Sequence, residues 1–157
     1  MTGPVTKPSR APSVLVVLVV KEAAQWLREC LSSLAAQTYP RLGVVAIDDA
    51  SKDGSREILT KALGEGRVVS LPEPLGTARA ISSALRMPAA ASADFVCFMH
   101  DDVELDPDTI TQMVEAATTV PDVGVVGPKV VDHDNPRLLK DVGRSADRFG
   151  HGRAGSF

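Results

Sequence analysis

Two pairs of adjacent aspartates are the residues of this sequence whose type and spacing point most directly to chemistry. Asp48 and Asp49 directly follow one apolar segment, and Asp101 and Asp102 directly follow another. Adjacent carboxylates at the end of a buried segment are costly unless water, hydrogen-bond donors or cations compensate their charge. A divalent cation held by carboxylate and diphosphate oxygens is one such compensation, and it would also act as a Lewis acid on a leaving diphosphate.

Each acidic pair also has a purely structural interpretation. Asp101 and Asp102 are compatible with a loop that carries a capping acid, and their spacing does not choose between this loop and a metal site. Residues 48–55, with the sequence DDASKDGS, have the composition of a turn, which favours a structural role. A functional carboxylate in this turn would accept a hydrogen bond from a nucleobase or from a ribose hydroxyl.

Two further polar residues lie near these acids in the sequence. His100 directly precedes the second pair, where it is a metal ligand, a neighbour of one, or simply the polar end of a strand, and its position favours the last. Arg79 lies on a predicted helix after Gly76. A solvated or ion-paired role is the default for this arginine, unless the start of the helix points towards phosphate groups.

Hydrophobic periodicity predicts the elements that position these residues. Residues 14–20 are apolar on both faces, as in a parallel strand that is covered on both sides. Apolar residues at three- and four-residue spacing predict helices, and Trp26 occupies a core-facing position of the first. The predicted strands cover residues 14–20, 42–47, 67–71, 95–99 and 123–126, and the predicted helices cover residues 23–34, 58–63, 78–85 and 106–117.

This alternation of strands and helices predicts an α/β fold, a three-layer α/β/α sandwich with a mainly parallel, Rossmann-like sheet. Ligands of such sheets bind beyond the carboxyl ends of the strands, where the strand order reverses. If strands 42–47 and 95–99 flank strand 14–20, the acidic pairs lie two strand spacings apart, about 10 Å. That span suits a nucleoside diphosphate, with base and ribose at one end and the diphosphate at the other.

The bulk composition is that of a globular domain, with 44% hydrophobic and 24% charged residues among 157. Aromatic residues make up only 4%, so Val, Leu, Ile and Ala must form the core. The net charge of -3, without a cluster of Lys or Arg, argues against a nucleic-acid partner. Cys30 and Cys97 lie in apolar patterns, and we expect two reduced core cysteines.

The domain organisation follows from where the periodicity begins and fades. Residues 1–12, with three prolines, predict a flexible N-terminal tail, and residues 13–128 form the predicted core. Residues 129–157 show little periodicity, so we expect them to begin a further, incomplete region. The longest apolar run is far shorter than the ~20 residues of a membrane helix, and no signal peptide is evident. We therefore expect a cytoplasmic chain, with membrane contact only through parts outside this sequence.

Five segments of the chain, in the right order between about residues 14 and 150, resemble motifs of family 2 glycosyltransferases. These enzymes have the GT-A fold, which the chain would carry in an apparently truncated form, and the resemblance is greatest to large actinobacterial members. The segments are residues 26–40 (WLRECLSSLAAQTYP), 45–55 (VAIDDASKDGS), 75–80 (LGTARA), 98–107 (FMHDDVELDP) and 123–128 (VGVVGP).

The resemblance implies roles for five residues. Asp49 matches the second acid of the family's DDGS-type element, which contacts the base of the donor nucleotide, and Asp48 would support it. Asp102 matches the last acid of the DxD-type motif, which binds Mg²⁺ or Mn²⁺ on the donor diphosphate. Asp101 matches the middle position, next to the metal and the sugar or ribose, and Arg79 matches an arginine that lies near the donor in some members.

The sequence departs from the family pattern in three places. His100 stands where the family often has the first Asp of the DxD-type motif. Lys21 and Glu22 stand where an aromatic residue and Asn usually follow the first strand. Nothing before Phe157 matches the family's catalytic base, so we expect the base beyond this residue, a start of the acceptor-side region in residues 129–157, and a chain that binds nucleotide without turnover.

The resemblance therefore predicts inverting transfer of a sugar from a nucleotide-diphosphate sugar to an acceptor glycan or lipid-linked glycan, in the synthesis of cell-envelope polysaccharide at the cytosolic face of a membrane. One alternative is a non-catalytic nucleotide-binding or interaction module with the same fold. Another is a nucleotidyltransferase, which would show a Gly-rich loop with Arg or Lys after the first strand. Residues 21–24, KEAA, do not resemble that loop.

Overall fold

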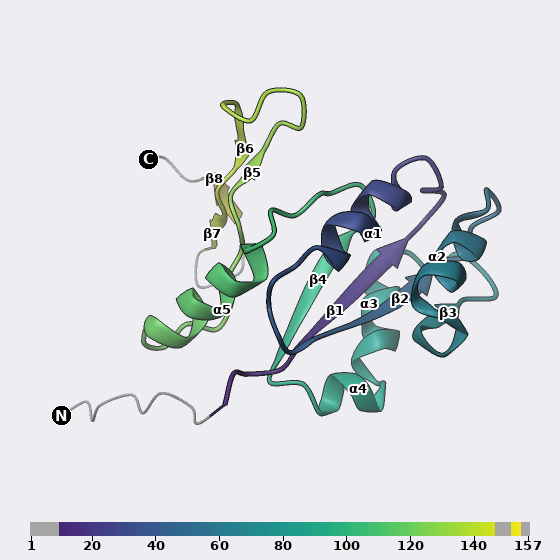
Figure 1. The fold of residues 1–157 in the computed structure, drawn as a ribbon, viewed down its shortest axis with the longest axis horizontal. Coiled ribbons are helices and arrows are strands. Elements are labelled where there is room, and N and C mark those ends of the chain that lie inside the picture. The colour runs from purple at the N-terminus through teal and green to yellow at the C-terminus, as the bar shows by residue number, and fades with distance from the viewer. Residues whose placement is uncertain (1–9, 147–151, 155–157) are drawn as a thin grey trace. The chain divides into compact units, whose positions relative to one another are not determined.

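The computed structural model describes residues 10–146 and 152–154 of the chain. These residues form two compact units that divide between Asp108 and Thr109. The first unit holds a parallel sheet with its helices, and the second holds one helix and short antiparallel strand pairs (Figure 1). Most of the predicted N-terminal tail, residues 1–9, lies outside the described residues, and the predicted core boundary at residue 128 remains a prediction.

A four-stranded parallel sheet forms the centre of the first unit. Its strands are β1 (Val14–Val20), β2 (Leu42–Asp48), β3 (Val68–Ser70) and β4 (Phe95–His100), in the order β3-β2-β1-β4. Every neighbouring pair runs parallel. All seven residues of β1 are buried, as expected for a β-branched, apolar strand that has a neighbour on each side and helices on both faces.

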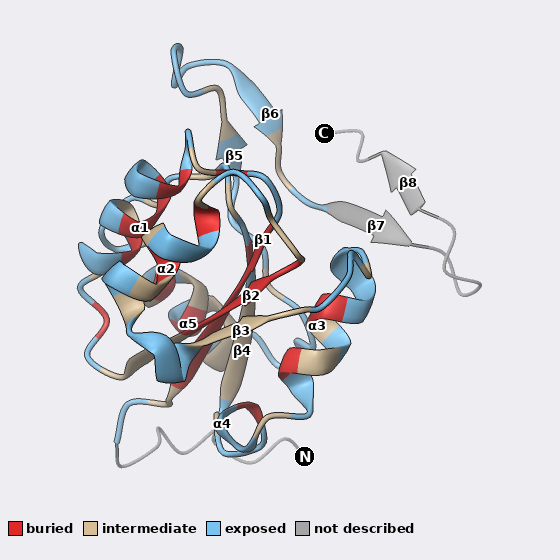
Figure 2. Cartoon of the chain, turned by 90° about the vertical axis from the view of Figure 1, so that its right-hand side faces the viewer, coloured by how far each residue is buried: buried red, intermediate tan, exposed pale blue. Residues whose placement is uncertain are grey.

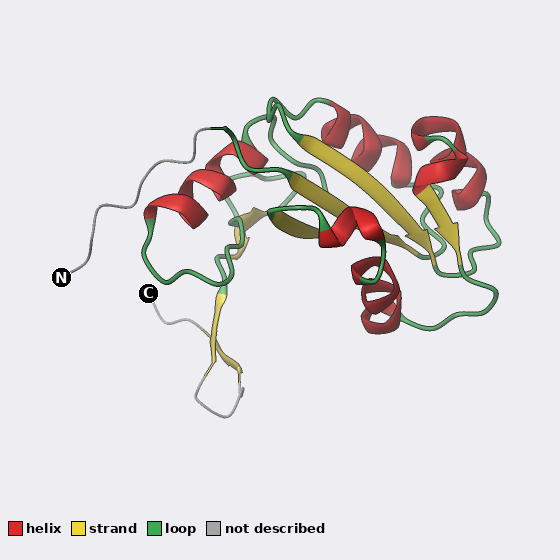
Figure 3. Ribbon diagram, turned by 90° about the horizontal axis from the view of Figure 1, so that it is seen from below, coloured by secondary structure: helices red, strands yellow, loops and turns green. Residues whose placement is uncertain are grey.

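Helices cover both faces of this sheet, which confirms the predicted three-layer arrangement. Figures 2 and 3 show α1 (Leu27–Ala35) and α2 (Ser55–Leu63) on one side, and α3 (Thr77–Leu85) on the other. The short helix α4 (Pro88–Ala91) was not predicted from the sequence; it adds Ala90 to the core on the α3 side.

The two faces of β1 supply two apolar cores. Leu15, Val17 and Val19 pack with Ala80 and Ala84 of α3. The residues between them point to the opposite face, because side chains alternate along a strand. That face is covered by the apolar stripe of α1, whose buried residues are Leu27, Cys30, Leu31 and Leu34.

Trp26 is not a core residue, contrary to the prediction. The residue is 51% exposed, and the helix starts only at Leu27, with Trp26 at the N-cap position. The buried stripe at 27, 30, 31 and 34 satisfies the three- and four-residue spacing without it. The main-chain carbonyl of Ala23 accepts hydrogen bonds from the amides of Trp26 and Leu27, so residues 23–26 form a turn.

The second unit begins with α5 (Thr109–Thr119), of which Ile110 and Val114 are buried. The helix α5 was predicted to begin at Asp106, but it begins at Thr109. The carbonyls of Asp106 and Pro107 accept hydrogen bonds from Gln37 and from the amide of Thr38, and are thus used outside the helix.

The predicted strand at residues 123–126 is wrong, because no strand is assigned to these residues. Val125 is 92% exposed and Val123 is 38% exposed. A strand needs a neighbour that pairs with its amides and carbonyls, and the two glycines in and beside this segment weaken strand formation further.

Short strand pairs instead occur in the region where periodicity had faded. β5 (Val130–Val131) pairs antiparallel with β6 (Leu139–Asp141), and β7 (Arg144–Ala146) pairs with β8 (Gly152–Ala154). Strands of two or three residues are too short to produce a readable alternation, so the sequence did not indicate them. An ion pair of 2.8 Å between Lys140 and Asp132 links β6 to the turn that precedes it.

A hydrogen-bonded clamp joins the starts of β1 and β4. The amide and the hydroxyl of Ser13 both donate to one carboxylate oxygen of Asp94 at 2.7 Å, and the amide of Asp94 donates back to the hydroxyl at 3.0 Å. The hydrogen bonds from Ser13, with a smaller contribution from the charge of Arg41, hold the pKa of Asp94 below its ordinary value.

This clamp predicts a dependence of stability on pH. Because the folded pKa of Asp94 is lowered, its contribution to stability is present above the unfolded value, about 3.9, and is lost as pH falls through the folded pKa. The test is thermal unfolding of the wild type and of Asp94→Asn at several pH values from 2.5 to 7. At neutral pH, Asp94→Asn should have the lower Tm. The difference should vanish at the acidic end. A difference in Tm that is constant across this range would contradict the assignment.

Candidate functional site

The strand order brings both acidic pairs to one edge of the sheet. β1 lies between β2 and β4, and the register pairs Val20 with Asp48 and Val19 with His100. Along the chain, β2 and β3 follow β1 on one side of it in the sheet, and β4 then lies on the other side of β1. The reversal therefore lies beside β1, which is where ligands bind in open parallel sheets.

Asp49 is buried, and its carboxylate is fully engaged with the backbone of another loop. One oxygen accepts from the amide of Leu75 at 2.7 Å, and the other accepts from the amide of Gly76 at 3.0 Å. The residue as a whole is 3% exposed. Gly76 has φ +79°, a conformation that glycine adopts without steric cost, and it directly precedes α3. Asp49 therefore fixes the loop that leads into α3.

Asp48 is also directed into the protein, with 2% of the residue exposed. Its carboxylate accepts from the amide of Ser51 at 3.0 Å, which closes the turn after β2, and its main-chain carbonyl accepts from the amide of Leu71. The turn chemistry expected for residues 48–55 is therefore present. The carboxylates of Asp48 and Asp49 thus both belong to buried residues and accept hydrogen bonds from the backbone.

Lys21 connects the two acidic pairs, a link that sequence reasoning did not find. Its amide donates to a carboxylate oxygen of Asp101 at 2.8 Å, and its side-chain ammonium donates to the main-chain carbonyl of Asp49 at 2.8 Å. Lys21 directly follows β1, the strand between β2 and β4. Its two hydrogen bonds therefore connect the end of β4 with the end of β2. The signal available in the sequence was its unusual position directly after the central strand.

Hydrogen bonds also hold the loop after β1 against the turn after β2. The amide of Glu22 donates to the hydroxyl of Ser51 at 3.0 Å, and its carboxylate accepts from the amide of Lys52 at 3.1 Å. Two more bonds run from the amide of Ala23 to the Ser55 hydroxyl and from the amide of Ala24 to the Asp53 carboxylate. These contacts fix the position of the backbone around Lys21.

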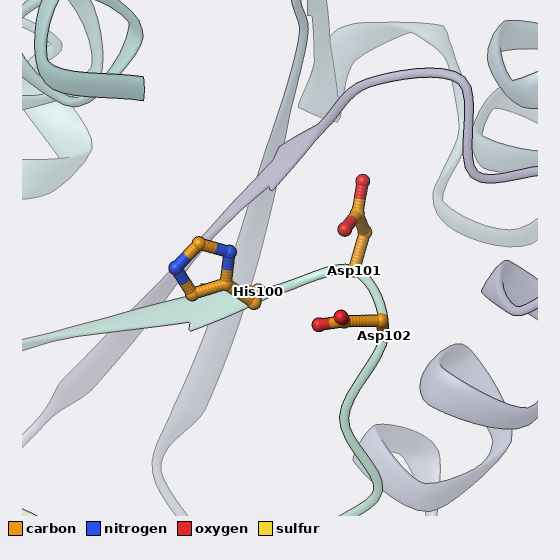
Figure 4. A group of neighbouring side chains, drawn as sticks. All are labelled: His100, Asp101 and Asp102. Carbon is orange, nitrogen blue, oxygen red and sulfur yellow. The ribbon is translucent and has the colours of Figure 1, made fainter. Parts of the chain in front are cut away.

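His100, Asp101 and Asp102 form a compact group of potential metal ligands at the end of β4 (Figure 4). One donor atom from each side chain lies within 4.8 Å of the others. His100 and Asp102 are exposed, and Asp101 is half-buried. Two ligands on opposite sides of a cation with bonds of about 2.1 Å are about 4.2 Å apart, so small side-chain rotations close the group around an ion. The donor set thus fits a divalent cation.

The thiol of Cys30 lies next to the backbone of His100, and burial and the negative charges of Asp101 and Asp102 affect its pKa. The buried thiol donates to the main-chain carbonyl of His100 at 3.8 Å. Burial raises the pKa of Cys30 to about 12, and the negative charges of Asp101 and Asp102 contribute to this shift. The thiol is therefore a neutral, inert support for the end of β4, in agreement with the expected reduced core cysteine.

This environment predicts that Cys30 is unreactive in the folded protein. A thiol with a pKa of about 12 is a thiolate in about one molecule in ten thousand at pH 8. In a Cys97→Ser background, reaction with a disulfide reagent at pH 8 should be slow, and urea should release one fast-reacting thiol. Fast reaction of the folded variant would show that Cys30 is accessible and charged.

Arg79 lies in the first turn of α3, and its amide donates to the carbonyl of Gly76 at 3.1 Å. The residue is exposed, and within the described part of the chain its guanidinium has no hydrogen bond or ion pair. The structure places the arginine on the helix that Asp49 anchors, but does not bring its guanidinium to the acids. Its role near a donor stays a prediction.

The sequence model of glycosyl transferase family 2 matches residues 15–152. The chain belongs to glycosyltransferase family 2. Among curated proteins, the chain is 28% identical over 162 residues to the O-antigen biosynthesis protein RfbC of Myxococcus xanthus, with 94% of this chain and 12% of that protein covered. It is 33% identical over 108 residues to an N-acetylglucosaminyltransferase of Mesorhizobium japonicum, with 65% of this chain and 25% of that protein covered.

Solved structures place this family 2 chain in the GT-A fold, as predicted. The mannosyltransferase PcManGT of Pyrobaculum calidifontis, solved in complex with GDP-Man and Mn²⁺, superimposes with a TM-score of 0.65 at 28% identity. The match covers 74% of this chain and 35% of that one. The chain thus spans a small part, 12% to 35%, of the length of these relatives. Among the described residues of the chain, no helix has the length and apolar character needed to cross a membrane.

Proposed function

We propose that the chain is the donor-binding part of a glycosyltransferase, and that it binds a nucleotide-diphosphate sugar together with a divalent cation at the carboxyl ends of β1, β2 and β4. The observation that carries this proposal is the group of His100, Asp101 and Asp102 at the point where the strand order reverses. Membership of family 2 and the likeness to a mannosyltransferase that holds GDP-Man and Mn²⁺ support it.

The cation, Mg²⁺ or Mn²⁺, is assigned to Asp102 and Asp101. A cation bound there would neutralise charge on a leaving diphosphate. Asp102 is exposed and free to turn towards a ligand, whereas Asp101 already uses one oxygen to hold the amide of Lys21 and has the other for a cation. Asp101 therefore both fixes the loop after β1 and contributes to the cation site.

The nucleoside end is assigned to the turn after β2 and the loop before α3. Because both oxygens of Asp49 accept backbone amides, its main contribution is to position residues 75 and 76, with Asp48 supporting the turn. The ammonium of Lys21 supplies a positive charge between this end and the cation site. Arg79, on the exposed first turn of α3, is assigned to the donor phosphates or sugar, where the positive end of the helix also favours anions.

The complete reaction that we propose is inverting transfer to a glycan or lipid-linked glycan, in the synthesis of cell-envelope polysaccharide. The name of the O-antigen biosynthesis relative supports this acceptor class. No described residue is assigned as the general base that would deprotonate the acceptor hydroxyl. The residues of this chain bind and orient the donor, and residues 129–157 are proposed to begin the acceptor side.

Calorimetric titration of the chain with UDP, GDP and dTDP, each with and without Mn²⁺, tests the proposal. At least one nucleotide should bind, and the cation should strengthen that binding by about tenfold or more, since it bridges protein carboxylates and diphosphate oxygens. A chain that is folded by circular dichroism but binds none of the three nucleotides would overturn the proposal. Binding that is indifferent to the cation would instead support a module without the metal-dependent donor site.

A further inference from the structure

We infer that the ammonium group of Lys21 binds the diphosphate of the donor, and that it gives the site a preference for a nucleoside diphosphate over the bare nucleoside. This inference rests on the proposed function, because the ligand concerned is the proposed donor. It deepens that proposal by naming the side chain that recognises the diphosphate, at a position where the sequence departs from the family pattern.

The backbone amides of residues 21–24 are all engaged with side chains from other loops. The amide of Lys21 donates to Asp101, and the next three amides donate to side chains of the turn after β2. Amides in a loop after a central strand often bind phosphate, but each of these four already has an acceptor. The side-chain ammonium of Lys21 is therefore the group of this loop that can still bind an anion.

The ammonium of Lys21 lies on the path that the proposed donor would follow. It donates to the carbonyl of Asp49, at the end of β2, while the amide of the same residue donates to Asp101, after β4. The ends of β2 and β4 are two strand spacings apart, about 10 Å, with the end of β1 between them. A nucleotide with its base beyond β2 and its phosphates at the cation site passes the end of β1, which Lys21 directly follows.

The ammonium has the donors and the exposure that a phosphate contact needs. Lysine carries three N–H donors, and the structure uses one of them on the carbonyl of Asp49. Lys21 is an exposed residue. Within the described part of the chain, it is the one positively charged side chain with a hydrogen bond or ion pair to a residue of either acidic pair. Two N–H groups can therefore donate to phosphate oxygens while the bond to Asp49 persists.

A fixed backbone presents this lysine. Glu22, the next residue, has φ +50°, in the left-handed region that residues with a side chain rarely adopt. Its amide donates to Ser51 and its carboxylate accepts from the amide of Lys52, and these bonds hold the conformation. Such strained residues persist where their surroundings fix them, and they are frequent at ligand sites. Because the backbone is already ordered, contact with a phosphate costs less entropy.

The balance of charge at this edge of the sheet also favours a phosphate contact by Lys21. Four aspartates lie there, and a diphosphate adds further negative charge that one divalent cation only partly compensates. The charge of Lys21 reduces this repulsion. A nucleoside without phosphate carries no negative charge, so its binding gains nothing from the ammonium.

The test compares a nucleoside with its diphosphate at one excess concentration of Mn²⁺. The pair is uridine and UDP, guanosine and GDP, or thymidine and dTDP, chosen by the diphosphate that binds most tightly. Shifts of amide signals in NMR titrations report the weak binding of the nucleoside as well. Lys21→Met should weaken diphosphate binding by about tenfold or more, which is the loss expected for a hydrogen bond to a charged group, and should leave nucleoside binding nearly unchanged.

Three further variants complete this test. Lys21→Arg keeps the positive charge and should bind the diphosphate more tightly than Lys21→Met. Lys61→Met is the matched control, because it removes an exposed lysine on α2 and should bind both ligands like the wild type. Lys21→Gln keeps an N–H donor for the carbonyl of Asp49 without the charge, and it serves if Lys21→Met fails to fold.

The outcomes separate this inference from the proposed function. Equal weakening of nucleoside and diphosphate in Lys21→Met would show that Lys21 only holds the carbonyl of Asp49, and would overturn the inference. Unchanged diphosphate binding in that variant would also overturn it, while the donor site would stand. If the folded wild-type chain binds none of the three diphosphates, the proposed function and the inference are both wrong.

Discussion

Replacing Asp102 by asparagine should weaken nucleotide binding in the presence of Mn²⁺ by about tenfold or more, which removes the strengthening that the cation provides. Even residues that only orient metal ligands typically change metal affinity by 10- to 100-fold, and Asp102 is assigned as a ligand itself. Its exposed carboxylate is within 4.8 Å of two other donor groups, so its loss leaves the cation with an incomplete set. Calorimetry with the best-binding nucleotide and Mn²⁺ measures the effect directly.

The matched control for this variant is Glu29→Gln, which removes one exposed negative charge on α1, outside the cation site. The control should bind nucleotide and Mn²⁺ like the wild type. Nucleotide binding without the cation should differ little between Asp102→Asn and the wild type, because the variant removes the bridge and not the nucleoside contacts. Equal cation-dependent binding by Asp102→Asn and Glu29→Gln would exclude Asp102 as a ligand.

Asp49→Ala should lower the free energy of unfolding by about 3 kcal/mol or more. The carboxylate accepts hydrogen bonds from two backbone amides in a residue that is 3% exposed, and hydrogen bonds to charged groups contribute about 1.5–3 kcal/mol each. Alanine would leave the amides of Leu75 and Gly76 without their acceptor in a poorly hydrated position. Urea unfolding followed by circular dichroism measures the loss.

Asp49→Asn provides the graded comparison for this prediction. Its amide keeps one oxygen as an acceptor and loses the other, so the free energy of unfolding should fall between the values of Asp49→Ala and the wild type. This order of stabilities is expected if the carboxylate of Asp49 holds the loop before α3. A carboxylate that only contacted nucleotide would leave the free energy of unfolding unchanged in both variants. If Asp49→Ala unfolds within about 0.5 kcal/mol of the wild type, the buried hydrogen bonds of Asp49 do not stabilise the loop.

The fold of the first unit was predictable because its elements are long and strongly patterned. Residues 14–20 are apolar on both faces, which is typical only of a strand with cover on two sides, and the structure buries all of them. The four-residue spacing in α1 likewise gave its buried stripe. Where the pattern is short or ambiguous, tertiary contacts decide, and this is why the segment 123–126 and the exposed Trp26 were misjudged.

The candidate site was predictable in its position but not in its internal hydrogen bonds. In a parallel sheet, the carboxyl ends of all strands lie at the same edge. The aspartates that follow β2 and β4 therefore share that edge. The engagement of Asp49 with residues 75 and 76, and the two bonds made by Lys21, join parts of the chain 26 to 80 residues apart. Such contacts depend on the assembled fold, and no local spacing in the sequence specifies them.

Paramagnetic broadening by Mn²⁺ tests the location of the proposed site most directly. With nucleotide present and Mn²⁺ added below one equivalent, the amide signals of Lys21, Asp101 and Asp102 should broaden first. Those of Ser13 and Phe95 should keep their intensity, because they lie at the opposite ends of β1 and β4, about 20 Å away along the strands. Broadening that is strongest at Ser13 and Phe95, or that spares the end of β4, would contradict a cation and nucleotide site at the carboxyl edge of the sheet.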